Sequence, residues 1–97
     1  MNFNIGQQIE LKLMVGDKTY QTEHKCIYQI IGTCRLLLND YNLGRILGIN
    51  EDMKEDDIIE TLIIQNISGY KFWNEYDQFS FITKEYLTKE ILNQNSF

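Results

Sequence analysis

The only histidine of the chain, His24, lies two residues before one of its two cysteines, Cys26. An imidazole beside a thiol can generate a thiolate nucleophile, so this pair is the first candidate for catalysis. On one β-strand this spacing puts both side chains on the same face, with their Cβ atoms roughly 7 Å apart. Because no third group to orient the histidine is evident, we prefer a rim histidine beside a buried thiol. A small cysteine–histidine enzyme is the remote alternative.

Other motifs for catalysis or ligand binding are incomplete. The HKC stretch lacks the glutamate of a zinc deaminase, and a chain without proline has no PCxxC. Residues 42–48, NLGRILG, lack the GKS or GKT of a phosphate loop. Residues 50–60 offer a lysine and no glycine where a calcium loop needs oxygen ligands and a central glycine. We therefore expect no enzymatic activity, no metal site and no cofactor.

The stretch EDMKEDDIIE, residues 51–60, is the most acidic part of the chain. Apolar residues from Ile58 to Ile67 recur at helical spacing, which predicts a helix that ends at Ser68-Gly69. Asn50 or Asp52 can cap this helix, and the first acids then complement its dipole. Asp56, Asp57 and Glu60 remain on or near the outer face of this helix. The acids of the whole stretch and two aromatic residues further along are our candidate partner-binding residues: Glu51, Asp52, Glu55, Asp56, Asp57, Glu60, Trp73 and Tyr76.

The N-terminal segment predicts a β-hairpin. Residues 9–15 alternate between apolar and polar, as in a half-buried strand, and residues 18–31 read as the returning strand. A two-residue turn at Gly16-Asp17 sets the register, so that Leu11 faces Thr22 and Glu10 faces Glu23. Such a like-charge pair costs a few tenths of a kcal/mol, and two solvated carboxylates are its simplest interpretation.

Three further elements complete the prediction. Residues 33–47 favour a helix through Leu36, Leu43 and Leu47, although the Asn39-Asp40 step could instead end a short strand at Leu38. Residues 69–73 and 78–82 predict an aromatic hairpin, with Tyr70 opposite Phe81. The last segment predicts a helix capped by Thr83, with four apolar residues facing inward: Tyr86, Leu87, Ile91 and Leu92.

The expected fold is a single domain over residues 1–97 in the order ββ-α-α-ββ-α. This is a two-layer α+β architecture, in which an antiparallel sheet made from two hairpins packs against two or three helices.

The net charge of −5 makes a long phosphate backbone or an anionic membrane a poor partner. A protein with a basic surface is the natural partner. The segment MNFNIGQQIELKLMV does not read as a signal peptide, so a cytoplasmic location is expected. The leading hypothesis is a small acidic inhibitor of phage, mobile-element or anti-CRISPR type, or an immunity protein. The alternative is a structural subunit or homodimer that buries the aromatic hairpin. The plainest interpretation of the candidate residues is that Trp73 packs under a helix and that the acids are only solvated.

The opening IGQQIEL…GDKTYQTE resembles the start of bacterial flagellar-brake regulators with a PilZ domain, over some 20 residues. The arginine-rich dinucleotide motif of that family is absent, so the resemblance implies no ligand for this chain.

Overall fold

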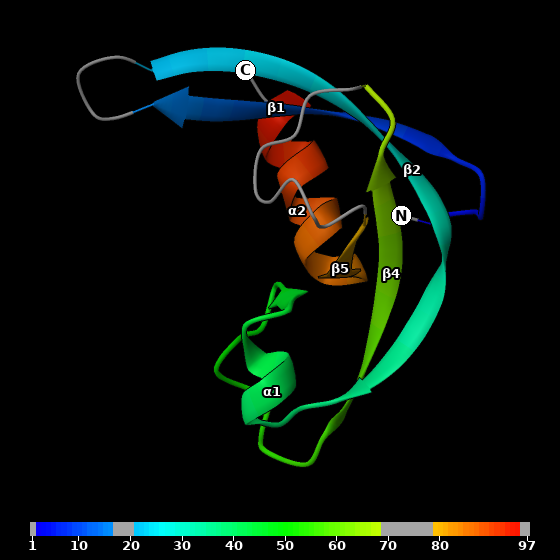
Figure 1. Ribbon diagram of the computed structural model, residues 1–97, viewed down its shortest axis with the longest axis vertical. Coiled ribbons are helices and arrows are strands. Elements are labelled where there is room, and N and C mark those ends of the chain that lie inside the picture. The colour runs from blue at the N-terminus through cyan, green and yellow to red at the C-terminus, as the bar shows by residue number, and fades with distance from the viewer. Residues whose placement is uncertain (1, 17–20, 69–78, 96–97) are drawn as a thin grey trace.

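The computed structural model describes residues 2–16, 21–68 and 79–95 (Figure 1). Trp73, Tyr76 and the predicted aromatic strand at residues 69–73 lie outside these ranges. The described elements, in chain order, are β1 (Gln8–Gly16), β2 (Gln21–Leu37), α1 (Asp40–Leu43), β3 (Ile46–Leu47), β4 (Ile58–Asn66), β5 (Phe79–Thr83) and α2 (Lys84–Asn95).

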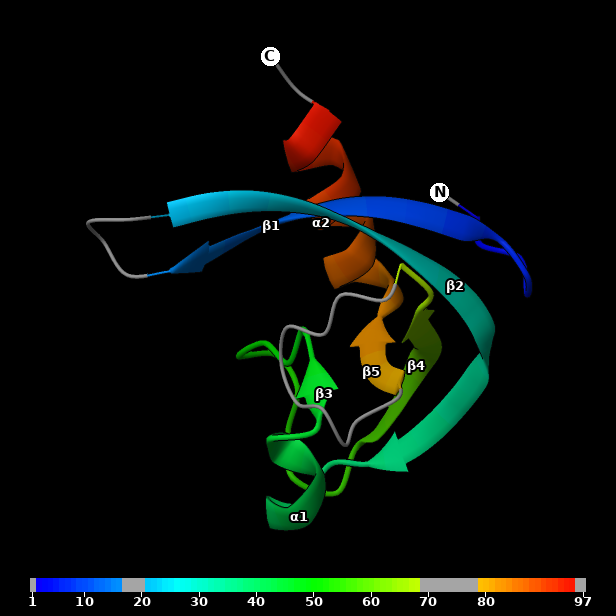
Figure 2. The same ribbon diagram turned by 45° about the horizontal axis from the view of Figure 1, so that its top comes forward.

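All five strands join one sheet in the order β1-β2-β4-β5-β3. The sheet is mixed, because β3 pairs with β5 in parallel while the other neighbours are antiparallel. Figure 2 shows how the long strand β2 bends, with α2 beside β1 and β5. The expected two-layer fold with two or three helices is therefore wrong, since α1 has four residues and α2 is the one long helix described.

The N-terminal hairpin forms, but in a different register from the expected one. Gly16 is the last residue of β1 and pairs with Gln21, so Leu11 faces Cys26 rather than Thr22. This displacement of four residues along β2 keeps the same residues on each face, because side chains alternate with a period of two. Glu10 faces Ile27, and its carboxylate lies 3.9 Å from Lys25, so the expected pair with Glu23 does not exist.

The helix predicted for residues 33–47 is wrong over most of its length. Strand β2 continues to Leu37, past an irregularity between Ile30 and Gly32 that adds one residue to the strand. A short helix, α1, follows, and Asn39 caps it by accepting a hydrogen bond from the Asn42 backbone N–H. In α1, Tyr41 packs under the Arg45 guanidinium, which also lies over Phe81.

The helix predicted after residue 51 is also wrong, because residues 58–66 form the central strand β4. Ile59 and Thr61 are buried on one face of this strand, and Leu62 and Ile64 are buried on the opposite face. A strand with neighbours on both edges and buried residues on both faces reads as a continuous apolar run. Such a run contains helical spacings by chance.

Strand β5 confirms the expected strand around residues 79–82. Phe81 lies opposite Ile63 of β4 on one side and Ile46 of β3 on the other. Both edges of β5 are therefore occupied at this residue, and Tyr70, its expected partner, lies outside the described residues.

The C-terminal helix is confirmed as α2. Thr83 Oγ1 accepts a hydrogen bond from the Tyr86 backbone N–H, which is the expected N-cap. Leu87 is fully buried and Ile91 packs against the same core. Tyr86 and Leu92, also expected to face inward, are 40% and 56% exposed.

The core consists of two clusters that use opposite faces of β4. The larger cluster lies on the face that α2 covers and contains Leu62, Ile64, Ile82 and Leu87. The smaller cluster, around Ile59, lies on the other face and is closed by residues of the β3–β4 connection. At the start of β4 the sheet is therefore packed mainly on the side of the smaller cluster, and the α2-side face has no cover from the described residues there.

Candidate functional site

The acidic segment between β3 and β4 consists of turns rather than a helical first turn. Asn50 Oδ1 accepts from the Asp52 N–H at 3.0 Å, and Asp57 Oδ2 accepts from the Lys54 N–H at 2.8 Å. Side chains of Asn and Asp stabilise turns in this way. Asn50 and Asp57 therefore have structural roles, and no helix is capped here.

Backbone hydrogen bonds attach the acidic segment to the end of β2. The Asp56 N–H donates to the Leu38 carbonyl at 2.9 Å, and the Leu38 N–H donates to the Asp57 carbonyl at 2.8 Å. Asp56 has a φ of 71°, a conformation that Asp adopts more readily than most residues. Glu51, Asp52 and Glu55 are exposed, and none of their carboxylates has a hydrogen bond or ion pair within the described residues.

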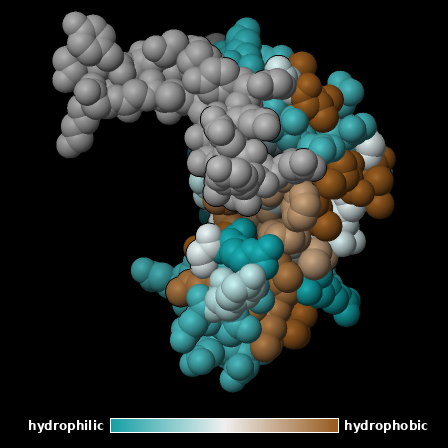
Figure 3. All heavy atoms as spheres, in the orientation of Figure 1, coloured by the Kyte–Doolittle hydropathy of each residue, from teal (hydrophilic) through white to brown (hydrophobic). Residues whose placement is uncertain are grey.

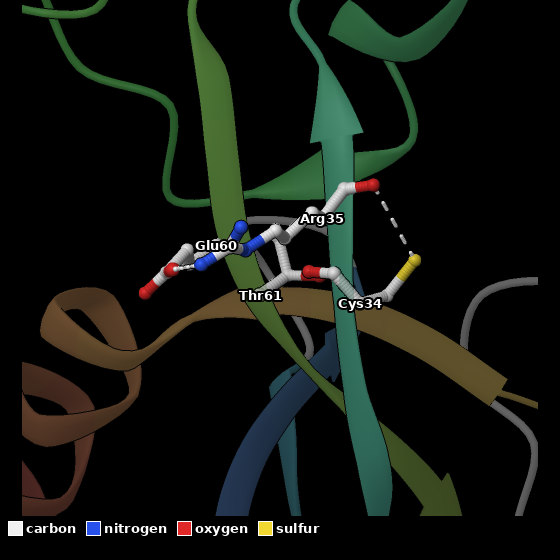
Figure 4. A network of polar contacts seen from close by, with 4 residues as sticks. All are labelled: Cys34, Arg35, Glu60 and Thr61. Atoms are coloured by element: carbon white, nitrogen blue, oxygen red, sulfur yellow. Dashed lines mark hydrogen bonds and ion pairs between the residues drawn. The ribbon is translucent and has the colours of Figure 1, made fainter.

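Glu60 lies apart from the other acids because it belongs to β4. Its Oε1 accepts from Arg35 Nη2 at 2.9 Å across the β2–β4 pair (Figure 4). The two side chains are 74% and 75% exposed. An ion pair so open to solvent contributes about 0–1 kcal/mol to stability.

Arg35 and Glu60 lie in the middle of a bare strip of sheet, which we call the uncovered face. It lies on the same side of the sheet as α2, where β2 ends and β4 begins. Its members are Thr33, Arg35, Leu37, Ile58 and Glu60. At its far end Leu37 and Ile58 face each other across the strands and are 40% and 59% exposed. Figure 3 shows brown and teal spheres side by side over this part of the molecule.

Sequence reasoning missed Leu37 and Ile58 as surface residues. Both belong to apolar runs that suggested buried helix faces, and nothing in the runs distinguishes these two positions from their neighbours. Their exposure follows from strand alternation, since Leu36 and Ile59 point to the opposite face and into the smaller cluster. Two exposed residues of α1, Tyr41 and Leu43, lie at the same end of the molecule.

The structure brings five of the expected site residues together in the acidic segment. Glu60 lies on the uncovered face, and the positions of Trp73 and Tyr76 are outside the described residues. The acidic segment leads directly into the uncovered face, because Ile58 follows Asp57 in the chain. The candidate site is therefore an exposed apolar pair bordered by carboxylates.

Two hollows lie near this region. One, of about 510 Å³, opens onto the uncovered face and is lined in part by Phe3, Arg35, Glu60 and Lys84. The other, of about 310 Å³, lies between α2 and the segment after β3, and its lining includes Gly48, Tyr86 and Lys89. The acidic residues 51–57 line neither hollow.

The cysteine–histidine pair is poorly placed for nucleophilic catalysis. Cys26 is fully buried, opposite Leu11 in the larger cluster, where a substrate would have to enter the packed core. The His24 backbone lies in β2 opposite Leu13, and its side chain is outside the description. The Cys34 thiol is half-buried and donates weakly to the Arg35 carbonyl at 3.8 Å.

Burial beside Cys26 also changes the ionisation of a core tyrosine. Tyr28 is 2% exposed, and its burial, with a smaller effect of Cys26, raises the pKa of its hydroxyl from 10.0 to about 12. The buried hydroxyl therefore keeps its proton at a pH where the unfolded chain has lost it.

This difference predicts a loss of stability at alkaline pH that Tyr28→Phe should reduce. Below pH 10 the group contributes nothing, and as the pH rises to about 12 only the unfolded state releases the proton, which favours unfolding. We expect the fall in unfolding free energy between pH 8 and 12 to be smaller in the variant by about 2 kcal/mol. Urea unfolding across this range measures it. Tyr41→Phe, at a 75% exposed tyrosine, is the control, and equal alkaline losses in both variants would contradict the assignment.

Within the described ranges, no cluster of three or more His, Cys, Asp or Glu side chains is placed to hold a metal ion. In the same part of the chain, no helix has the length and apolar character needed to cross a membrane. Comparisons of the chain with protein-family models, with curated proteins and with solved structures found no match.

Proposed function

We propose that this chain is a non-enzymatic protein that binds a basic surface of a protein partner. One observation carries the proposal: the exposed Leu37–Ile58 pair lies directly beside the acidic segment, which is attached to the same strand end. Exposed apolar side chains supply contact energy, and surrounding charge supplies steering and selectivity. An inhibitor or immunity protein, of phage or mobile-element origin, is the form of this function that we favour.

Charge supports the choice of partner. Residues 50–57 contain five carboxylates and one lysine, a net charge of −4 within a chain of −5. The three carboxylates of Glu51, Asp52 and Glu55 are not engaged by the described residues, so their charge is available to a partner. Basic side chains around an apolar patch would be the complementary surface.

The test compares two changes of this surface with a matched control. The wild-type chain, the double variant Glu51→Lys/Glu55→Lys, Ile58→Asp and the control Glu10→Lys/Glu85→Lys are immobilised and exposed to lysate of the native organism. We expect a basic protein that wild type and control retain and both site variants lose. The captured partner should bind at least about tenfold more weakly to the double variant at low salt, with a flatter salt dependence.

Equal capture by all four proteins would contradict the proposal, as would a partner whose affinity does not respond to salt. Glu51 and Glu55 are suitable because reversing them removes no described hydrogen bond, whereas reversing Asp57 would remove the bond to the Lys54 N–H. A structural role as a homodimer makes a different prediction. It requires concentration-dependent sedimentation that Ile58→Asp abolishes, in the absence of any partner.

A further inference from the structure

The cleft of about 510 Å³ beside the uncovered face combines features that the acidic segment lacks. Its walls come from four parts of the chain: the N-terminal arm at Phe3, strands β2 and β4, and the first residue of α2, Lys84. The volume lies within the range of small-molecule sites, about 300–1,000 Å³. We propose that this cleft binds a small monocarboxylate with an apolar body.

Two cations from different elements line the cleft. Arg35 uses one donor of its guanidinium for Glu60, at 2.9 Å, and a guanidinium carries five N–H donors in a planar fork. Lys84 is exposed and has no ion pair within the described residues. A carboxylate can therefore be held by the open edge of Arg35 and by the Lys84 ammonium without breaking the Arg35–Glu60 pair.

The charge of the cleft selects the charge of the ligand. Arg35, Lys84 and Glu60 together give +1, in a chain whose net charge is −5. A monovalent anion neutralises this charge, whereas a divalent phosphate would meet the Glu60 carboxylate with excess negative charge. A carboxylate therefore fits the charge of the cleft better than a phosphate monoester does.

The uncharged residues that line the cleft determine which kind of group attached to the carboxylate would fit. Phe3 is partly buried against the larger core cluster, and Leu62 belongs to that cluster, so both present an apolar wall to the cleft. Thr33 adds an exposed hydroxyl, whereas the Thr61 hydroxyl already donates to the Cys34 carbonyl at 3.0 Å. A ring or branched alkyl group attached to the carboxylate matches this wall.

Benzoate is a suitable probe, because it joins one carboxylate to one apolar ring. In a ¹H–¹⁵N titration of the full chain, we expect saturable shifts centred on residues 33–35, 60–62 and 84, with a Kd of about 1–10 mM. Sodium chloride at equal ionic strength should not reproduce them, and phenyl phosphate should bind more weakly than benzoate. Arg35→Gln and Lys84→Gln should each raise the Kd about fivefold or more, because each removes one charge-assisted contact.

Two further variants separate the cleft from general electrostatics. Glu60→Gln removes the competing carboxylate and should tighten benzoate binding a few-fold, whereas Lys89→Gln, on the same helix but outside the cleft, should leave it unchanged. The double variant Glu51→Lys/Glu55→Lys should also leave it unchanged, so this inference stands independently of the proposed protein partner. No saturable shift up to about 50 mM benzoate, or equal effects of the Arg35, Lys84 and Lys89 variants, would overturn it.

Discussion

Gly48→Ala is expected to lower the free energy of unfolding by about 3 kcal/mol, through strain and overlap together. Gly48 has a φ of +97°, and a Cβ at this position would overlap Thr83 Oγ1 and the Tyr86 Cβ. The same contact holds a hydrogen bond, since Thr83 Oγ1 donates to the Gly48 carbonyl at 3.5 Å. Because Thr83 is the N-cap of α2, the substitution should also loosen the start of that helix.

Gly6 and Gly44 separate the contribution of backbone strain from that of steric overlap. Gly6 has a similar φ of +91° with nothing near the position of a Cβ, so Gly6→Ala should cost about 1 kcal/mol from conformation alone. Gly44 has a φ of −85° and open space, so Gly44→Ala should change stability by less than about 0.5 kcal/mol. Urea unfolding followed by circular dichroism gives all three values. Similar losses for Gly48→Ala and Gly6→Ala would show that the close approach to α2 is absent.

Leu87→Ala is expected to lower the free energy of unfolding by about 3–4 kcal/mol, a large part of the 5–15 kcal/mol of a typical small domain. Leu87 is completely buried, with 0% of its surface exposed, and it belongs to the larger core cluster. Ile91, one turn further along α2, packs against the same cluster. Alanine there leaves a cavity between the helix and strands β4 and β5, which cannot close without moving the helix.

Leu92→Ala is the matched control, because it makes the same change on the same helix at a side chain that is 56% exposed. We expect a loss below about 1 kcal/mol. The difference between the two leucines, measured by chemical unfolding, reports how firmly α2 is docked on the sheet. Equal losses of stability in both variants would contradict an orientation of α2 that buries Leu87 and exposes Leu92.

The N-terminal hairpin shows how a correct element can carry an incorrect register. Alternation in residues 9–15 predicted β1 correctly, because one face of the strand is buried and the other is not. The pairing depended on the turn, and Gly16 belongs to the strand and pairs with Gln21 instead of forming the turn. Since the displacement is an even number of residues, the predicted inward residues Ile9 and Leu11 remained inward and buried.

Strand β4 shows why the acidic segment was assigned to the wrong element. Ile58, Ile59, Leu62 and Ile63 fit a helical stripe, but the same residues fit a strand with apolar side chains on both faces. β-branched residues predominate in residues 58–64, which was the available signal for a strand. That preference becomes decisive only when β2 and β5 occupy both edges, which is a property of the whole sheet.

The uncovered face could not be predicted for a related reason. Leu37 and Ile58 have the same apolar character as Leu36 and Ile59, but strand alternation points them to the other face of the sheet. On that face of β4 the buried cluster that includes Leu87 of α2 contains Leu62 and Ile64, and Ile58 stays exposed. Coverage depends on where a helix near the C-terminus packs, far along the chain from both strands. The proximity of Lys84 to Arg35 around one cleft arises in the same way.

The sequence by itself determined the first strand, the C-terminal helix with its Thr83 cap, and the acidic composition of residues 51–57. Each depends on interactions between residues a few positions apart, where alternation, capping and local charge act directly. Only the tertiary structure decided the sheet order, the strand at residues 58–66 and the exposure of the Leu37–Ile58 pair. These depend on contacts between residues far apart in the chain, whose free energy exceeds the small local preferences that a sequence displays.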